Sequence, residues 1–389
     1  MSIYSDASII LPQDPYRKAG VIYALKPIDG TADFTVVRAS VANEINSDGL
    51  IEEVVANMPR FDYTDGTCPS LLLEPQSTNI ITYPLSFDNA YWTQSGWTIS
   101  SGFTSPDGAS NAFSVLRDAG VAFSRTISLL ANTKYTYSIY VKNVDATSIV
   151  LRIKNIAGNS NGFEDNCVVY DVTSQTNTET FTRIQHTFNT GDAGNYLIYA
   201  GYYSVGTYLC FGAQLEALSY ATSLMLPATE GSTTTRLKDE VSKTGLSGSI
   251  NSEEGTLFVE MAAFSDDSSS KLISLNDGTT SNKIEFGYFG GNSIFVNLWV
   301  GGVSQGYLSH TVDITQVNKI AYKYELNDTS LWLNGVEVAT DNSATMPVGL
   351  NSFDFDNGVG INRFYGKVKQ LQVFKTALTD EELATLTTL

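Results

Sequence analysis

The chain has 389 residues, of which 42% are hydrophobic, and this is enough for two or three domains that each bury a core. It contains no apolar run of about 18 residues, which excludes a transmembrane helix. Its 23 basic and 41 acidic side chains give a net charge of −18 that is spread along the chain, so the clustered positive charge that nucleic-acid binding requires is missing.

Residues 1–85 have an irregular pattern, because short apolar runs alternate with turn signals such as Asp29-Gly30. The apolar runs are Ile9–Leu11, Val21–Leu25, Phe34–Val37 and Leu71–Leu73. They show too little periodicity to indicate an independent core. We therefore expect an irregular N-terminal anchoring segment that docks on a partner or on other copies of this chain; an ordinary small β-domain is the alternative.

Residues 86–226 have the pattern of successive strands. Apolar and polar side chains alternate over Thr133–Lys142 and over Ser148–Lys154, which is the period of a half-buried strand. Further strands are expected at Phe181–Phe188, Tyr196–Tyr203 and Thr207–Leu215. Strands that recur with polar turns between them, and without an amphipathic helix, favour an antiparallel sandwich.

Residues 227–252 interrupt this pattern with small, polar and charged side chains, and they predict a linker or a strap that crosses between domains. Residues 253–389 predict a second sandwich. Its expected strands are Thr256–Met261, Lys283–Phe289, Ser293–Val300, Lys319–Leu326 and Gly366–Phe374. Asn334-Gly335 lies between two apolar arms, which is a type I′ hairpin signal. Thr379 and Glu382 form a capping box that predicts a short final helix.

The expected fold class is therefore all-β. Two antiparallel jelly-roll β-sandwiches follow the N-terminal anchoring segment, and a short C-terminal helix closes the chain. The expected boundaries are 1–85 for the anchoring segment, 86–226 for the first jelly roll, 227–252 for the linker and 253–389 for the second sandwich.

A series of motifs near the amino terminus carries a resemblance to a known class of proteins. Thr35–Ser40, Asn46–Glu52, Pro59–Tyr63 and Leu73–Asn79 follow one another in the order and spacing seen in the leading segment of many bacteriophage structural proteins. The chain thus resembles a fibre, spike or tail-associated protein on the surface of a phage particle. The resemblance implies that residues 1–85 attach the protein to the virion.

Two further stretches resemble carbohydrate-related modules. Phe87–Trp92, Gly212–Glu216 and Ala221–Ser223 are similar to a carbohydrate-binding-module-like jelly roll that commonly follows such a leading segment. Gly366–Leu383 resembles the closing strand and helix of laminin-G or concanavalin A-like domains, and Trp332–Val338 resembles their internal hairpin. These resemblances imply binding of host cell-surface glycans.

The residues that catalysis would need are not grouped in the sequence. Concanavalin A-like glucanases place two carboxylates on one strand, whereas Glu260 and Glu285 are solitary and are expected to face solvent. His186 and His310 belong to no cluster with metal-ligand spacing, and no Gly-x-Ser-x-Gly motif occurs. We expect no enzymatic activity; a polysaccharide depolymerase and a bacterial or prophage adhesin are the alternatives.

Aromatic side chains are the candidate sugar-binding residues. Sugar rings stack on aromatic faces while their hydroxyl groups meet amides and carboxylates, so a site needs exposed Trp or Tyr beside such groups. The candidates are Trp92, Trp97, Tyr202, Tyr203, Trp299 and Tyr307. Trp97 is the first choice, because Gly96, Thr98 and serines surround it in the sequence. Each ring could instead pack in a core, as buried Trp usually does.

Acidic loops are the candidate calcium ligands, since hard cations prefer carboxylate and carbonyl oxygens. The candidates are Asp266, Asp267, Asp354 and Asp356. None has EF-hand spacing, and ordinary turns account for all four, because Asp and Asn next to Gly form turns in any case. We expect no required cofactor, with calcium as an optional ligand.

The expected partners follow from the phage resemblance. They are other virion proteins through the N-terminal segment, further copies of the chain in a homotrimer, and host surface polysaccharide, without nucleic acid or membrane insertion. The amino terminus shows no secretory signal, and Cys68, Cys167 and Cys210 suit buried free thiols of a reducing compartment. The expected location is the virion surface, after synthesis in the host cytoplasm and release by lysis.

Overall fold

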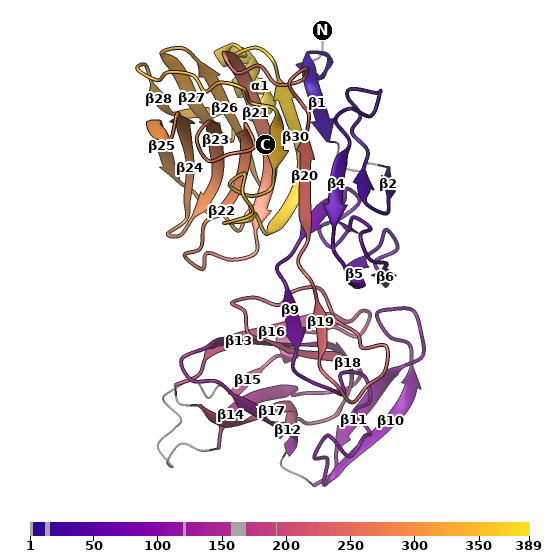
Figure 1. Cartoon of the computed structure of the whole chain (residues 1–389). Coiled ribbons are helices and arrows are strands. Elements are labelled where there is room, and N and C mark those ends of the chain that lie inside the picture. Colours follow the sequence, from indigo (N-terminus) through magenta and orange to yellow (C-terminus); the bar gives the residue numbers. More distant parts are fainter. Residues whose placement is uncertain (1–2, 12–15, 120–121, 157–168, 192) are drawn as a thin grey trace. The chain divides into compact units, whose positions relative to one another are not determined.

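The computed structural model describes residues 3–11, 16–119, 122–156, 169–191 and 193–389 (Figure 1). The chain forms two compact units. Unit 1 comprises Met1–Ser47, Val54–Pro75 and Leu237–Leu389, and unit 2 comprises Asp48–Glu53 and Gln76–Arg236. The predicted fold class is confirmed: the described residues form antiparallel sheets, and the α-helix found among them is the short C-terminal α1 (Asp380–Thr387).

Unit 1 contains two large sheets. The β21 sheet consists, in order, of β28 (Val336–Asp341), β27 (Asp328–Leu333), β26 (Asn318–Glu325), β21 (Glu254–Ala263), β30 (Gly366–Phe374), β8 (Ser70–Leu73) and β7 (Phe61–Asp62), and β1 (Ala7–Leu11) also pairs with β30. The β22 sheet consists, in order, of β2 (Arg17–Lys18), β3 (Val21–Ile22), β4 (Phe34–Val37), β20 (Glu240–Thr244), β29 (Ser352–Asp354), β22 (Lys271–Asn276), β23 (Lys283–Phe289), β24 (Ser293–Val300) and β25 (Val303–Thr311).

One apolar core joins these two sheets. Alternate residues of each strand point into it, as strand geometry requires. On β24, for example, Ile294, Val296 and Leu298 belong to the core. The N-terminal residues Ile9 and Phe34 are buried in the same core. Strands far apart in the chain therefore bury a common interior.

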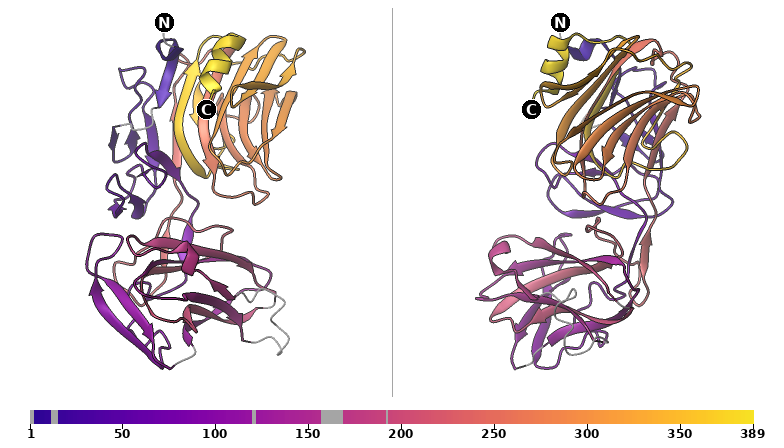
Figure 2. Two further views of the ribbon diagram at one scale, coloured as in Figure 1. Left: turned by 180° about the vertical axis from the view of Figure 1, so that it is seen from behind. Right: turned by 90° about the vertical axis from the view of Figure 1, so that its left-hand side faces the viewer.

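Helix α1 covers the outer face of the β21 sheet. Figure 2 shows it in yellow on the outside of the sandwich. Its Leu383 and Leu386 belong to a second apolar cluster with Phe258 of β21 and Trp332 of β27. The predicted capping box is present, because Thr379 accepts a hydrogen bond from the Glu382 backbone N–H while the Glu382 carboxylate accepts from the Thr379 backbone N–H.

Unit 2 is a smaller sandwich of two sheets. The β13 sheet consists, in order, of β10 (Trp97–Phe103), β11 (Ala112–Arg117), β18 (Thr207–Glu216), β13 (Lys134–Asn143) and β16 (Thr182–Asn189). The β17 sheet consists, in order, of β12 (Ala122–Leu129), β17 (Gly194–Tyr202), β14 (Val150–Asn155) and β15 (Val169–Asp171). The two sheets enclose an aromatic-rich core of their own.

The remaining short elements complete the description. They are η1 (Ile3–Ser5), β5 (Ala42–Ile45), β6 (Ile51–Val54), β9 (Ser77–Asn79), η2 (Thr173–Gln175) and β19 (Thr234–Arg236). In unit 2, β9 pairs with β19 through Ser77 and Arg236. No helix in the part of the chain that the structure describes is long and apolar enough to span a membrane.

The division into units differs from the boundaries expected at residues 85, 226 and 252. Strands β1, β4, β7 and β8 of the expected anchoring segment pair with strands of the C-terminal sandwich. Strand β20, from the expected linker, lies between β4 and β29 in the middle of a sheet. The physical reason is that these short strands bury apolar side chains that have no independent core. Residues 76–236 are therefore inserted between two parts of unit 1.

The motifs that resemble a phage leading segment build a buried ionic network in unit 1. The Arg60 guanidinium donates to Glu74 at 2.6 Å and also to Asp239, and Arg38 donates to the other oxygen of Asp239 at 3.1 Å. Both arginine side chains are fully buried. Burial alone would lower the pKa of Arg60, but the negative charges of Asp239 and Glu74 outweigh it and raise that pKa.

The cysteines are free where they are described. Cys210 is buried, as expected, and burial raises the pKa of its thiol above the usual range. Cys68 is exposed, which corrects the expectation of a buried thiol. Cys167 lies outside the described residues.

Candidate functional site

The two outer faces of unit 1 differ in character. The face of the β21 sheet carries α1 and its apolar cluster. On the β22 sheet, the strand alternation that sends Ile294, Val296 and Leu298 inward sends Phe295, Asn297 and Trp299 outward. This outer face therefore presents aromatic rings beside polar groups.

Aromatic rings of this face lie on neighbouring strands, with Phe289 on β23, Phe295 and Trp299 on β24 and Tyr307 on β25, and the Tyr307 ring is the most exposed of the four. We call Phe295, Asn297, Trp299, Ser304 and Tyr307 the β24–β25 patch. Strand register places Asn297 opposite Tyr307 and Trp299 opposite Ser304. The Tyr307 ring is 56% exposed and stacks on Phe295 with 5.7 Å between ring centroids. Ser304 Oγ donates to Asn297 Oδ1 at 2.6 Å, which fixes the orientation of the amide.

A buried ion pair on β23 orients Trp299. Trp299 Nε1 donates to Glu285 Oε2 at 2.8 Å, and Lys283 Nζ donates to the other oxygen of that carboxylate. Lys283 Nζ also lies 5.5 Å from the centroid of the Trp299 ring. Because Lys283 fixes the Glu285 carboxylate, the hydrogen bond from Trp299 to that carboxylate holds the half-buried indole in one position at the surface.

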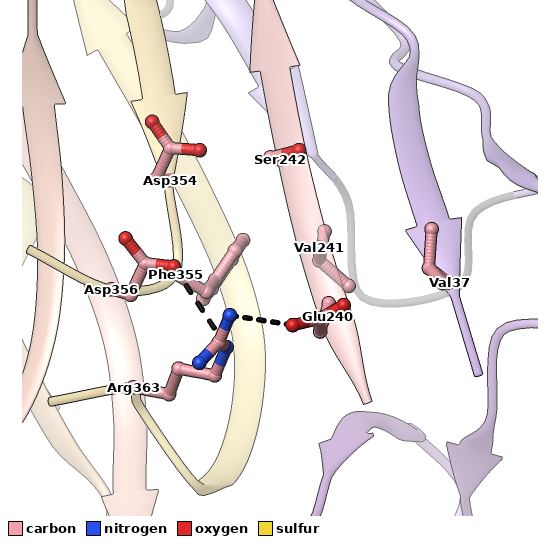
Figure 3. A pocket seen from close by; sticks show the side chains of 8 residues that line it. All are labelled: Val37, Glu240, Val241, Ser242, Asp354, Phe355, Asp356 and Arg363. Carbon is pink, nitrogen blue, oxygen red and sulfur yellow. Dashed lines mark hydrogen bonds and ion pairs between the residues drawn. The ribbon is translucent and has the colours of Figure 1, made fainter. Parts of the chain in front are cut away.

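An acidic pocket opens elsewhere on the β22 sheet, where β20 lies beside β29 (Figure 3). Its volume is about 200 Å³, and it is lined by Val37, Glu240, Val241, Ser242, Asp354, Phe355, Asp356 and Arg363. Arg363 donates to Glu240 at 2.5 Å, and its Nε lies 3.9 Å from Asp356. The charge of the single arginine is thus already matched by carboxylates.

Asp354 is a half-buried carboxylate of this pocket. Burial raises its pKa, the charge of Asp356 raises it further, and a hydrogen bond from Asn276 acts in the opposite direction. Asp356 Oδ1 accepts from the backbone N–H groups of Gly358 and Gly360, so it stabilises the loop that follows it.

The four aspartates proposed as calcium ligands do not come together. Asp266 accepts from the backbone N–H of Gly291 and of Asn292, whereas Asp267 accepts from Lys271 Nζ at 2.6 Å. Asp354 and Asp356 line the acidic pocket instead. Across the described ranges, no group of three or more His, Cys, Asp or Glu side chains is arranged to hold a metal ion.

Two of the six candidate aromatic residues are in the core of unit 2. Trp92 is 1% exposed and packs on Phe87, and Trp97 is 7% exposed and packs on Phe123. Their faces are therefore closed to a sugar ring, which corrects the expectation that made Trp97 the first choice. Gly201 is the reason that Trp97 fits: a side chain at that position would collide with its indole.

The other two candidates of unit 2 lie together at the end of β17. The rings of Tyr202 and Tyr203 meet edge to face with 4.7 Å between centroids. Tyr202 is half-buried and Tyr203 is 49% exposed. Arg152 lies 4.6 Å from the Tyr202 centroid, and Arg117 lies 5.1 Å from that of Tyr203.

The expected exposure of the two solitary glutamates is wrong. Glu260 is 6% exposed and accepts a hydrogen bond from Gln370 at 2.8 Å, and Glu285 is 9% exposed within its ion pair. They lie on different sheets, β21 and β23. His186 stacks on Tyr170, and burial lowers its pKa, while His310 is exposed.

Several members of the β24–β25 patch were not singled out from the sequence. Phe295 and Asn297 share a face with Trp299 through the alternation of β24, whereas Ser304 and Tyr307 lie beside them because β24 pairs with β25 in this register. The alternation within Ser293–Val300 was a usable signal for the β24 residues. The register between β24 and β25 could not be predicted from the sequence, because a bulge between Leu298 and Trp299 shifts it.

Comparison with known proteins identifies part of unit 1. Residues 242–384 match the Laminin_G_3 family model, described as the concanavalin A-like lectin/glucanases superfamily. The match covers less than half of the chain. None of the curated proteins compared with this chain matches it.

Solved structures resemble portions of the chain. The CBM40 of a Ruminococcus gnavus IT-sialidase is 21% identical, with a TM-score of 0.32 over 36% of this chain and 84% of that one. Domain 4 of AbnA, a GH43 arabinanase of Geobacillus stearothermophilus, is 12% identical, with a TM-score of 0.33 over 43% and 82%. A pentraxin of Limulus polyphemus is 13% identical, with a TM-score of 0.26 over 34% and 69%. Each likeness covers less than half of this chain.

Proposed function

We propose that this chain is a non-catalytic glycan-binding protein that holds saccharide on the β24–β25 patch. The observation that carries the proposal is the exposed Tyr307 ring beside the fixed amide of Asn297 and the oriented indole of Trp299. Aromatic surface next to a few well-placed polar groups is the usual composition of a small-molecule binding site. The match of residues 242–384 to a lectin-containing superfamily supports it.

Each residue of the patch has a separate part in the proposed binding. Tyr307 and Trp299 offer ring surface to the C–H face of a sugar. Because Ser304 occupies Asn297 Oδ1, the amide group of Asn297 is turned so that its Nδ2 is the donor for a sugar hydroxyl. The Lys283–Glu285 pair acts behind the indole and does not itself meet the sugar.

We further propose that the protein is displayed on the surface of a bacteriophage particle as a homotrimer. The motifs between Thr35 and Asn79 support this placement through their resemblance to phage structural proteins. Exposed Tyr16, Leu25 and Ile28 near the amino terminus also support a contact with other virion proteins. The glycan would then belong to the surface of the host cell.

The binding proposal is tested by two alanine variants. Tyr307→Ala and Trp299→Ala should each weaken binding of a polysaccharide selected on a glycan array by about tenfold or more, since an aromatic contact contributes about 0.5–1.5 kcal/mol beyond its buried area. Isothermal titration calorimetry measures the change. Binding should persist after chelation of divalent cations, because the patch contains no carboxylate, imidazole or thiol that would hold a metal ion.

Phe103→Ala is the matched control. Phe103 is a 40% exposed aromatic residue on β10 and lies outside the patch, so its removal should leave affinity within twofold. Equal losses in all three variants, or no glycan bound by the parent protein, would contradict the proposal. Release of reducing ends from a bound polysaccharide would show that the protein hydrolyses its ligand and would contradict a non-catalytic role.

The phage placement is tested separately. Mass spectrometry of purified particles should detect the chain, and a cryo-EM map should show it as a trimer on the particle surface. If the protein is missing from purified particles, the placement is wrong while glycan binding stands on its own measurement.

A further inference from the structure

Tyr203 adopts an unusual backbone conformation at the end of unit 2. Its φ of 50° lies in the left-handed region, which bulky side chains rarely occupy. Such strain persists only where the surrounding structure maintains it, and it is often found at binding sites. The ring it positions is 49% exposed, and no described residue forms a hydrogen bond with its hydroxyl group.

Arg117 reaches the same corner from the other sheet. It is the last residue of β11, and its guanidinium lies 5.1 Å from the centroid of the Tyr203 ring. Among the residues that the structure describes, no acceptor or carboxylate pairs with this guanidinium. Its five N–H donors thus remain available to a ligand.

Other arginines of unit 2 that stack on tyrosine are different. Arg125 lies 4.0 Å from the Tyr91 centroid and donates to the Tyr91 carbonyl at 3.1 Å. Arg183 lies 5.4 Å from the Tyr140 centroid and donates to the Thr222 carbonyl at 2.6 Å. A stacked arginine that only supports the fold therefore has acceptors of its own in this unit. Arg117 has the stacking without the acceptors.

The electrostatic surroundings favour an anion. The carboxylate next in sequence, Asp118, accepts from Thr98 at 2.7 Å and does not pair with Arg117. An arginine that has no acceptor among the described residues is notable in a chain with a net charge of −18. A carboxylate is the natural partner, because it can take two parallel N–H bonds from one guanidinium.

We propose that Arg117 and Tyr203 form a binding site for acidic sugars, distinct from the β24–β25 patch and independent of it. Arg117 binds the sugar carboxylate. The Tyr203 ring holds the guanidinium by its face, and its hydroxyl group and exposed edge meet the sugar hydroxyls. Unit 2 thereby recognises uronic or sialic acid units.

The probes are glucuronate, galacturonate and N-acetylneuraminate, each compared with its methyl ester, which removes the charge and keeps the sugar. Calorimetric titration of the full-length protein at low salt should show binding of at least one acid, with its ester at least tenfold weaker. Arg117→Gln should weaken binding of that acid by at least tenfold, and Arg117→Lys should recover part of it, because an ammonium keeps the charge without the fork.

Lys134→Gln is the matched control. It removes the same charge from the opposite end of the β13 sheet, because β18 runs from Thr207, opposite Leu116, to Glu216, opposite Thr136. Its affinity for the acid should stay within twofold. The inference is overturned if no acid binds, if acid and ester bind equally, or if Arg117→Gln and Lys134→Gln lose affinity alike.

One more variant separates this site from the proposed function. Tyr307→Ala should leave the affinity for the acid unchanged. A loss of affinity in this variant would show that the acid binds at the β24–β25 patch and would overturn the inference. Thermal unfolding confirms that each variant is folded, and the comparison of acid with ester in the parent protein decides the matter even if one variant is not.

Discussion

At the residue scale, Asp239 connects segments that are distant in the chain. Its two carboxylate oxygens accept from Arg38 and Arg60, and one of them also accepts from the Glu74 backbone N–H at 3.0 Å. All four residues are buried. A buried carboxylate is costly to desolvate and is tolerated only when its partners stay in place. The network therefore fixes how residues 38–74 lie on the start of the C-terminal part.

Arg60→Gln should destabilise unit 1 strongly. The substitution leaves Asp239 and Glu74 buried without the charge that compensates them, a loss of about 3–5 kcal/mol. Chemical unfolding followed by a probe in unit 1 measures it. Lys238→Gln, which breaks a surface ion pair with Glu240 whose side chains are 41% and 32% exposed, should change stability by less than about 1 kcal/mol. Similar losses of unfolding free energy in the two variants would contradict a structural role of the buried network.

At the element scale, the β27–β28 hairpin depends on its two turn residues. Asn334 and Gly335 have φ of 50° and 88°, the pair of positive values that a type I′ turn requires. Asn334 Oδ1 also accepts from the Lys319 backbone N–H at 2.9 Å, so the turn is joined to β26. The hairpin in turn brings Trp332 under α1.

Gly335→Ala should therefore destabilise unit 1 by about 1–2 kcal/mol, because an L-residue is strained in the left-handed region. The new methyl group would also approach Thr388 Oγ1 to 3.3 Å. Gly248→Ala is the control, since that glycine has no positive φ and no atom within 4 Å of the added carbon. It should leave the unfolding free energy unchanged or slightly raised, and an equal loss at both positions would contradict the turn argument.

The strands that sequence alone located correctly are those with a clear alternation. Lys283–Phe289, Ser293–Val300 and Gly366–Phe374 have the predicted bounds, because each strand places one apolar face on a core. Strands β3 and β7 are two residues long and β8 has four, and all of these residues except the half-buried Val21 are buried. Such short segments carry no periodicity, and β8 is placed in its sheet by pairing with β30, hundreds of residues away in the chain.

The candidate site was predictable to a similar degree. Tyr307 and Trp299 reach the surface because their strand positions alternate with core residues. Trp97 does not, because its burial depends on Gly201, a residue with no sequence relation to it. The polar residues next to Trp97 in the sequence could not reveal that Gly201, on another strand, leaves space for the indole.

At the scale of the whole molecule, unit 1 is discontinuous in sequence. The Asp239 backbone N–H donates to the Glu74 carbonyl at 3.0 Å, so the chain leaves unit 1 and returns to it at neighbouring points. Unit 2 has a separate core in which every member lies between Ile81 and Leu215. Each unit thus has what a domain needs to fold by itself.

Replacing residues 76–236 by a short Gly-Ser linker of about four residues should leave unit 1 folded. Calorimetry should show one cooperative transition close to that of unit 1 in the full chain. The residue 242–384 fragment is the comparison: it lacks β1, β4 and β8, which supply Ile9, Phe34 and Leu71 to the core, and should not fold. A stable fragment, or an unfolded linker variant, would contradict this view of unit 1.

The pairing of β1 with β30 also has a consequence for synthesis on the ribosome. Ser8 Oγ donates to the Val373 carbonyl across 365 positions of the chain, so β1 is made long before its partner. Unit 2 is complete long before that partner emerges. Contacts between residues so distant in sequence form slowly, and unpaired apolar strands are prone to aggregate while they wait. The nascent chain must therefore keep Ile9, Leu11 and Phe34 from other partners throughout translation, which makes this interval the one in which chaperones matter most.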